Sequence, residues 1–321
     1  MGALTGRVAL VAGATRGAGR GIAVALGEAG ATVYCTGRTS EVDARPEAPA
    51  CVSPFELKHR PETIEETARM VAAAGGRGIP VQADHSDPEV VAALAERIDA
   101  EAGGLDILVN DIWGGETLAE WGTPAWKVDV DKGRAMFEGA VMTHIITARH
   151  MIPLLLKRQG GLLVEITDGD ALYYRGTLFY DLVKTTVIRL AFAFAEELRD
   201  KGVTSVAVTP GFLRSEAMLE HMGTTEDAWQ DGAAGDPHFM FSETPRYVGR
   251  GIAALAADPE RLGLSGQVLS SWALADRYAV TDLDGSTPHW GRHAAEEDFG
   301  RDQRAGHRRF LAGFVGVPSA E

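Results

Sequence analysis

Cysteine is almost absent from this sequence of 321 residues, which contains only Cys35 and Cys51. Two cysteines cannot form a disulfide framework, and neither has a second cysteine or a histidine beside it at the spacing of a metal site. We therefore expect two free thiols in a reducing compartment and no bound metal. Cys35 lies in a short apolar run, where packing is the better explanation for a thiol.

Long hydrophobic runs and an excess of positive charge are also missing. No window reaches the roughly 20 apolar residues that cross a bilayer, and the first residues, Met1 to Arg7, lack the charged and apolar regions of a secretory signal. We therefore expect a cytoplasmic protein that does not contact a membrane. With 31 basic and 45 acidic residues the net charge is −14, which argues against a nucleic-acid surface. Any bound anion must be held by local features of the fold.

Short apolar, β-branched runs do recur along the chain, and longer stretches of helical periodicity separate them. This alternation is typical of a parallel sheet covered on both faces. The expected strands are Val8–Val11, Thr32–Thr36, Gly78–Gln82, Ile107–Asn110, Leu162–Ile166, Thr204–Val208 and Gln267–Ser270. The expected helices are Gly19–Ala29, Thr63–Ala74, Pro88–Ala102, Arg134–Lys157, Leu178–Lys201 and Pro245–Ala257.

Three segments lack this pattern, namely Thr39–Pro61, Gly211–Thr244 and Trp272–Glu321. The first holds four prolines, the second is a candidate cover, and the third follows the last strand. The sequence thus predicts an α/β fold with a doubly wound, Rossmann-like parallel sheet of about seven strands. We expect one domain over residues 1–271 and a C-terminal extension over residues 272–321, which packs on that domain or on a neighbouring subunit.

A glycine-rich turn joins the first strand to the first helix. It contains Gly13, Gly17 and Gly19, with Thr15 and Arg16 between them. Glycine lets the backbone approach a pyrophosphate closely, and the N–H groups of the new helix stabilise its charge. Because a strand precedes the turn and a helix follows it, we expect a dinucleotide site here.

The spacing of Gly13, Gly17 and Gly19 resembles the glycine motif of the short-chain dehydrogenase/reductase family, classical type, and the resemblance extends from about Arg7 to Leu269. It implies a nicotinamide cofactor, a small-molecule carbonyl or alcohol substrate and a homodimer or homotetramer. It also implies that Asp84 and the backbone of His85 lie near the adenine. Asn110 matches the first position of a further family motif, and Pro210, Gly211 and Ser215 match the segment that holds the nicotinamide carboxamide.

The end of the second strand indicates which nicotinamide cofactor binds. An NAD site usually places a carboxylate there to accept from the ribose 2′-hydroxyl, yet no carboxylate follows Tyr34 until Glu41. Arg38 is instead the candidate ligand for a 2′-phosphate, since a guanidinium binds phosphate in a bidentate manner. Arg16 is a second candidate. We therefore expect NADP (NADPH), with NAD as the less favoured cofactor.

Tyr180 and Lys184 lie four residues apart in a predicted helix, hence on one face. Carbonyl reduction needs a hydride on carbon and a proton on oxygen, but tyrosine titrates near ~10. A neighbouring lysine would favour the phenolate and lower that pKa. The pair also matches the family's Tyr-x-x-x-Lys motif, and the resemblance makes Tyr180 the catalytic acid and Lys184 its partner, which also holds the cofactor ribose.

The family's serine, which donates to the substrate oxygen, has no direct equivalent here. Counting back from Tyr180 favours Thr167, whereas counting along the strand favours Asp168. We favour Thr167, because a hydroxyl can donate to an oxyanion that an ionised Asp168 would repel; Asp168 could serve if burial kept it protonated. Alternatively, Asp168 and Asp170 merely shape a turn around Gly169.

The family's fourth catalytic residue, an asparagine, is also missing, and its position falls near Gly139 and Ala140. Two hypotheses follow from these departures. In the first, the chain is an NADP(H)-dependent enzyme that interconverts a carbonyl and an alcohol. In the second, it is a cofactor-binding sensor or scaffold whose catalysis is lost or atypical. Retention of both Tyr180 and Lys184 favours the enzyme.

Overall fold

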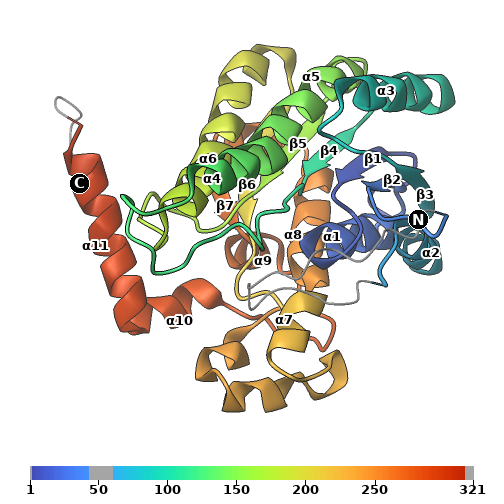
Figure 1. Cartoon of the computed structure of the whole chain (residues 1–321). Helices are drawn as coiled ribbons and strands as arrows, with labels where there is room; N and C mark the ends of the chain where they lie inside the picture. Colours follow the sequence, from blue (N-terminus) through green and yellow to red (C-terminus); the bar gives the residue numbers. More distant parts are fainter. Residues whose placement is uncertain (1, 43–60, 315–321) are drawn as a thin grey trace.

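Seven parallel strands form a single sheet in the order β3-β2-β1-β4-β5-β6-β7. The structure is a computed structural model that describes residues 2–42 and 61–314, and Figure 1 shows helices packed on both faces of the sheet. The predicted doubly wound, Rossmann-like fold is confirmed. The strands are β1 (Val8–Ala12), β2 (Thr32–Gly37), β3 (Arg77–Gln82), β4 (Ile107–Asn110), β5 (Leu162–Ile166), β6 (Thr204–Thr209) and β7 (Val268–Ser270).

The helices follow the predicted alternation, with one notable interruption. The helix expected over Arg134–Lys157 begins at Val130 and passes through a π-helical turn, η1 (Glu138–Met142). The α-helices are α1 (Gly17–Glu28), α2 (Ile64–Ala73), α3 (Pro88–Ala102), α4 (Val130–Phe137), α5 (Thr143–Leu155), α6 (Leu178–Leu198), α7 (Glu216–His221), α8 (Pro245–Ala257), α9 (Ser271–Tyr278), α10 (Trp290–Glu296) and α11 (Asp298–Ala312). Short 3₁₀ turns are η2 (Arg199–Lys201), η3 (Glu226–Ala234), η4 (Pro237–Phe241) and η5 (Arg261–Leu264).

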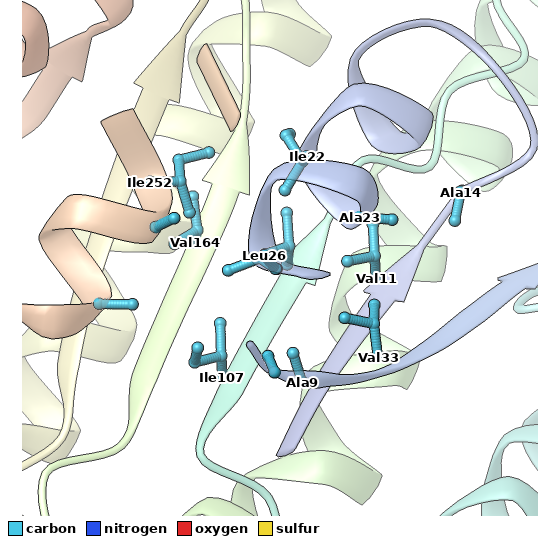
Figure 2. Packing of buried hydrophobic residues seen from close by; sticks show 14 of the residues in the cluster. Ala9, Val11, Ala14, Ile22, Ala23, Leu26, Val33, Ile107, Val164 and Ile252 are labelled. Atoms are coloured by element: carbon cyan, nitrogen blue, oxygen red, sulfur yellow. The ribbon is translucent and has the colours of Figure 1, made fainter. Parts of the chain in front are cut away.

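Strands β1, β4, β5 and β6 are buried along their whole length, because their side chains alternate between two cores on opposite faces of the sheet. Ala9 and Val11 of β1 join the core under α1 and α8 (Figure 2), whereas Leu10 joins the core under α3 and α5. Helices α1 and α8 approach closely, since a Cβ atom on Gly21 would lie 2.2 Å from the carbonyl oxygen of Pro245. This contact fixes the helix that follows the glycine-rich turn.

The residues at the two ends of helix α3 explain why the sequence predicts its bounds. The Asp87 side chain accepts hydrogen bonds from the backbone N–H groups of Glu89 and Val90, and Pro88 occupies the first turn. Gly103 ends the helix in the left-handed region, with φ of 70°. These are the preferred residues at both positions.

Some expectations fall outside the described residues. They concern most of the connection Thr39–Pro61, the thiol of Cys51 and residues 315–321 of the C-terminal extension. Cys35 is fully buried and burial raises its pKa to about 12, in keeping with a packing role. None of the described helices is both long and apolar enough to cross a membrane.

His85 is a buried histidine that links two layers of the fold. Its Nε2 atom lies 2.8 Å from Oγ1 of Thr36 in β2, and its Nδ1 atom lies 2.8 Å from Oγ1 of Thr147 in α5. Burial lowers the pKa of His85 to about 4. The unfolded chain therefore binds more protons than the folded protein between about pH 6.5 and pH 4.

We predict that this histidine makes the fold sensitive to acid. As the pH falls from about 6.5 to 4, the free energy of unfolding should decrease by up to about 3 kcal/mol through His85 alone. Urea unfolding at pH 7.0, 5.5 and 4.0 should show a shallower decrease for His85→Asn, which can hydrogen bond without titrating. Equal decreases in the wild type and the variant would contradict the assignment.

Candidate active site

The candidate residues meet at one edge of the sheet. Strands β1, β4, β5 and β6 are neighbours and run in the same direction, so the residues that follow them converge at their carboxyl ends. In open α/β sheets, ligands bind at this edge, where the strand order reverses.

Three glycines shape the turn after β1. A Cβ atom on Gly13, which has φ of 91°, would lie 2.4 Å from the carbonyl oxygen of Asp111, and one on Gly19 would lie 2.3 Å from the carbonyl oxygen of Gly13. Gly17 has φ of 56°. Thr15 is buried and packs against Gly37. A Cβ atom on Gly37 would lie 2.3 Å from the Thr15 hydroxyl oxygen. The turn therefore requires glycine at all three motif positions.

The start of α1 already holds an anionic group of the protein itself. The Gly17 N–H donates to Oε2 of Glu216 over 2.7 Å, and a guanidinium nitrogen of Arg20 lies 3.7 Å from Oε1 of the same carboxylate. Glu216 is the first residue of α7. The turn thus stabilises negative charge where a pyrophosphate would be held, so its residues fit a dinucleotide cofactor.

The two arginines expected near a 2′-phosphate differ in their surroundings. Arg38 is exposed at the end of β2, where its backbone carbonyl accepts from Nε2 of Gln82. Arg16 donates to Oε2 of Glu62 over 3.2 Å. A phosphate at Arg16 would therefore have to share that guanidinium with a carboxylate.

The residues expected near the adenine have local structural partners. Oδ1 of Asp84 accepts from the backbone N–H and the hydroxyl of Ser86. The ring of His85 is buried, as described above, so only its backbone suits the expected adenine contact.

The segment after β6 lies close to the C-terminal extension. A Cβ atom on Gly211 would lie 2.7 Å from Oε2 of Glu243 and 3.0 Å from Cβ of Trp290. Pro210 accepts from the Thr209 hydroxyl at its carbonyl oxygen, and the Ser215 hydroxyl caps α7 by accepting from the Met218 N–H. A contact of Ser215 with a nicotinamide carboxamide would compete with that cap.

Asp168, and not Thr167, lies against the phenol of Tyr180. The Tyr180 hydroxyl donates to Oδ2 of Asp168 over 2.8 Å. Thr167 is buried, and its hydroxyl donates to the backbone carbonyl of Lys184 over 2.9 Å. The preference for Thr167 over Asp168 as the donor to substrate stays a prediction, but only Asp168 contacts the phenol.

The pKa of Tyr180 also departs from expectation. Burial raises it well above the usual value, and the charge of Asp168 and the hydrogen bond to Asp168 raise it further. The expectation that Lys184 lowers this pKa is not met, since burial and the Asp168 carboxylate dominate it. Nζ of Lys184 lies 5.6 Å from the centre of the Tyr180 ring and 4.0 Å from that of Trp113. Burial lowers the pKa of Lys184, opposed by Asp168, Asp111 and Glu116.

Arg175 fixes the loop that carries Asp168. Its side chain is only 2% exposed, and it donates to the backbone carbonyls of Asp168, Ala171 and Tyr173 and to the carboxylate of Asp181. Asp181 lies in the first turn of α6, one residue after Tyr180. The arginine therefore couples the position of Asp168 to the helix that carries the phenol.

A buried polar network lies behind these residues. Nδ1 of His144 lies 2.5 Å from Oε2 of Glu165, and its Nε2 donates to the carbonyl of Ile112. Asn110 is fully buried and donates to Oε1 of Glu165 over 2.9 Å. Its amide is thus directed into this network, and the expected contact between Asn110 and the cofactor stays a prediction.

Asp111 links the glycine-rich turn to the lysine. Burial raises its pKa to about 7, while the charge of Lys184 and the backbone N–H of Gly19 lower it. Gly139 and Ala140, the expected position of the family's asparagine, lie in the π-helical turn η1, an irregularity that is frequent at functional sites.

Aromatic side chains surround the phenol. The rings of Trp113 and Trp121 lie 5.5 Å and 5.0 Å from the ring of Tyr180, whereas Trp126 is 83% exposed. Sequence reasoning left all three tryptophans unassigned, because aromatic residues are most often core residues. Two of them form a wall of the site.

Comparisons with known proteins agree with this arrangement. A family described as short chain dehydrogenase matches residues 48–226. Dehydrogenase/reductase SDR family member 1 from Homo sapiens is 36% identical over 292 residues, which cover 88% of this chain and 85% of that protein; the Mus musculus protein of the same name is 35% identical over the same shares. A solved short chain dehydrogenase from Mycobacterium thermoresistibile shares the fold, with a TM-score of 0.70 and 23% identity over 90% of this chain and 92% of that one. The chain therefore belongs to the short-chain dehydrogenase/reductase family, whose members are NAD(P)-dependent oxidoreductases of small molecules.

Proposed function

We propose that the chain is an NADP(H)-dependent oxidoreductase that interconverts a carbonyl and an alcohol, with Tyr180 as the proton donor and acceptor. The contact between the Tyr180 hydroxyl and Oδ2 of Asp168 carries this proposal. It puts a titratable pair beside Lys184, and Asp111 connects that lysine to the glycine-rich turn. A protein that only binds a cofactor has no need of such a pair.

The cofactor would be held by the glycine-rich turn at its pyrophosphate, by Arg38 at a 2′-phosphate and by Lys184 at the nicotinamide ribose. When bound, it supplies or accepts the hydride at the substrate carbon. Glu216 would leave the Gly17 N–H when the pyrophosphate arrives, because both anions require the same helix end.

In the reductive direction, Tyr180 gives its proton to the carbonyl oxygen as negative charge develops there. Asp168 takes the place of the family's serine. Since the phenol can donate only one hydrogen bond, Asp168 loses its partner when Tyr180 turns to the substrate. We propose that the Asp168 carboxylate holds the phenol in place until the substrate arrives and then releases it to the carbonyl oxygen. Lys184 stabilises the resulting phenolate.

The reaction is tested by following NADPH absorbance with the purified protein and a panel of ketones and aldehydes. We expect consumption with at least one of them and formation of the matching alcohol. Tight binding of NADPH without consumption of any carbonyl would instead support the hypothesis of a non-catalytic sensor or scaffold.

Arg38 should determine the preference for NADPH. We expect Arg38→Asp to weaken NADPH binding by about 10- to 100-fold, the range for a charge-assisted hydrogen bond, with little loss of NADH binding. Fluorescence titration with both cofactors measures this difference. Arg69→Asp, at another exposed arginine, should leave the ratio unchanged; equal losses of NADPH and NADH in Arg38→Asp would refute the assignment.

We propose a cytoplasmic homodimer or homotetramer, as the family resemblance implies. Light scattering on the purified full chain tests the assembly, and a monomer at micromolar concentration would contradict it.

A further inference from the structure

Two histidines and a glutamate meet where the segment after β6 contacts the C-terminal helices. His238 lies in η4, His293 in α10 and Glu297 at the junction of α10 and α11. Nδ1 of His238 lies 2.8 Å from Nε2 of His293. One ligand atom from each of the three residues lies within 4.8 Å of the other two.

Aromatic rings enclose this cluster. Phe241 stacks on His293 at 3.7 Å between ring centres with an angle of 8° between planes, and Phe299 lies edge-on to His238 at 5.4 Å. His293 is buried, and His238 and Glu297 are half-buried.

We propose that His238, His293 and Glu297 bind one zinc-class divalent cation. Two imidazoles and a carboxylate form a known ligand set for Zn²⁺, with water at the fourth position, whereas Mg²⁺ and Ca²⁺ prefer oxygen ligands throughout. Because Zn–N bonds are about 2.0–2.1 Å long, the two imidazole nitrogens would separate slightly and Glu297 would move inward. One of the two imidazoles donates the hydrogen bond between His238 and His293. In the metal site that imidazole would carry its proton on its other ring nitrogen, so neither histidine would have to lose a proton.

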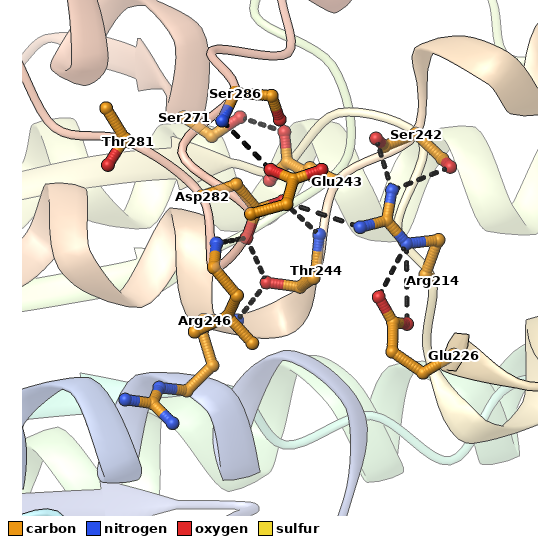
Figure 3. Close-up of polar contacts among 12 residues, drawn as sticks. Arg214, Glu226, Ser242, Glu243, Thr244, Arg246, Ser271, Thr281, Asp282 and Ser286 are labelled. Carbon is orange, nitrogen blue, oxygen red and sulfur yellow. Dashed lines mark hydrogen bonds and ion pairs between the residues drawn. The ribbon is translucent and has the colours of Figure 1, made fainter. Parts of the chain in front are cut away.

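Such an ion would join two parts of the chain that border the candidate active site. On one side, the segment after β6 is held by the buried Arg214, which contacts Glu226, Ser242 and Asp282 (Figure 3). On the other side, α11 reaches the Asp168 loop, where His307 accepts from the Leu172 N–H over 3.0 Å. The cation would therefore tie the C-terminal helices to the segment that borders Gly211.

Zinc titration of the full chain, without a histidine tag and after removal of metals with a chelator, tests this proposal. Calorimetry should give one Zn²⁺ per chain, and added Zn²⁺ should raise the Tm, whereas Mg²⁺ should do neither. Glu297→Gln and His238→Asn should each weaken Zn²⁺ binding at least about tenfold. Both positions are half-buried, so these variants should fold. Glu296→Gln, at the adjacent exposed residue, is the matched control and should bind like the wild type.

Cobalt provides a second measurement, since its visible absorption differs between four-coordinate and six-coordinate ions. We expect a four-coordinate spectrum in the wild type and in Glu296→Gln, and its loss in Glu297→Gln. A stoichiometry well below one, or equal Zn²⁺ affinities in the wild type, Glu297→Gln and His238→Asn, would overturn the site. None of these measurements depends on turnover, so they are independent of the proposed reaction.

Discussion

Tyr180→Phe should lower kcat/KM for carbonyl reduction by about 10²–10⁴-fold, the usual contribution of a positioned general acid. The substitution removes only the hydroxyl that donates to Asp168. The ring, with its contacts to Trp113 and Trp121, remains. Packing around the site should therefore persist, and the loss should appear in turnover, with NADPH binding within about threefold of the wild type. Steady-state kinetics and fluorescence titration on the same preparation measure both quantities.

Tyr174→Phe is the matched control, because Tyr174 belongs to the same region of the chain but is 60% exposed. It should keep full activity. If Tyr180→Phe turned over as fast as Tyr174→Phe, the phenol of Tyr180 would not be the acid. A Tyr180→Phe protein that no longer bound NADPH would contradict the assigned role in a different way, by showing that the hydroxyl mainly supports the cofactor site.

The fold could be predicted from the sequence because its signals are local. All seven expected strands are present; two have the expected ends and five differ by one residue at one end. Capping by Asp87 and the stop at Gly103 depend on residues adjacent in sequence. The π-helical turn at Glu138–Met142 was not predicted, since helical periodicity continues through it and no proline or glycine pair marks it.

The site was only partly predictable, because its decisive contacts join distant residues. Thr167 and Asp168 are adjacent in sequence, and only the direction of each side chain after β5 determines which of them contacts Tyr180. The residue types alone favoured the Thr167 hydroxyl over the Asp168 carboxylate as the hydrogen-bond donor to substrate. The contact of His144 with Glu165 spans 21 positions and that of His238 with His293 spans 55, so no local spacing indicated either. Arg175 likewise gave no signal, although its buried side chain holds the Asp168 loop.

Asp168→Ser should move the pH dependence of catalysis to lower pH. In the wild type the charge of Asp168 and its hydrogen bond both raise the pKa of Tyr180, so the phenolate needed for alcohol oxidation forms only at high pH. Serine keeps a polar side chain at this position but carries no charge. Removing both effects should shift the acidic limb of kcat/KM for oxidation downward by at least about one pH unit, equivalent to ~1.4 kcal/mol of electrostatic interaction.

The same substitution should move the reductive profile in the same direction. Reduction needs the protonated phenol, so kcat/KM in the wild type should decline only at high pH, where Tyr180 with its raised pKa ionises. With serine at position 168 that decline should begin at lower pH, while the rate at low pH stays within about tenfold. Asp170→Ser, at an exposed residue two positions on, should leave both profiles unchanged. Superimposable profiles for Asp168→Ser and Asp170→Ser would mean that the carboxylate does not influence the phenol during turnover, and Asp168 would then only shape the loop.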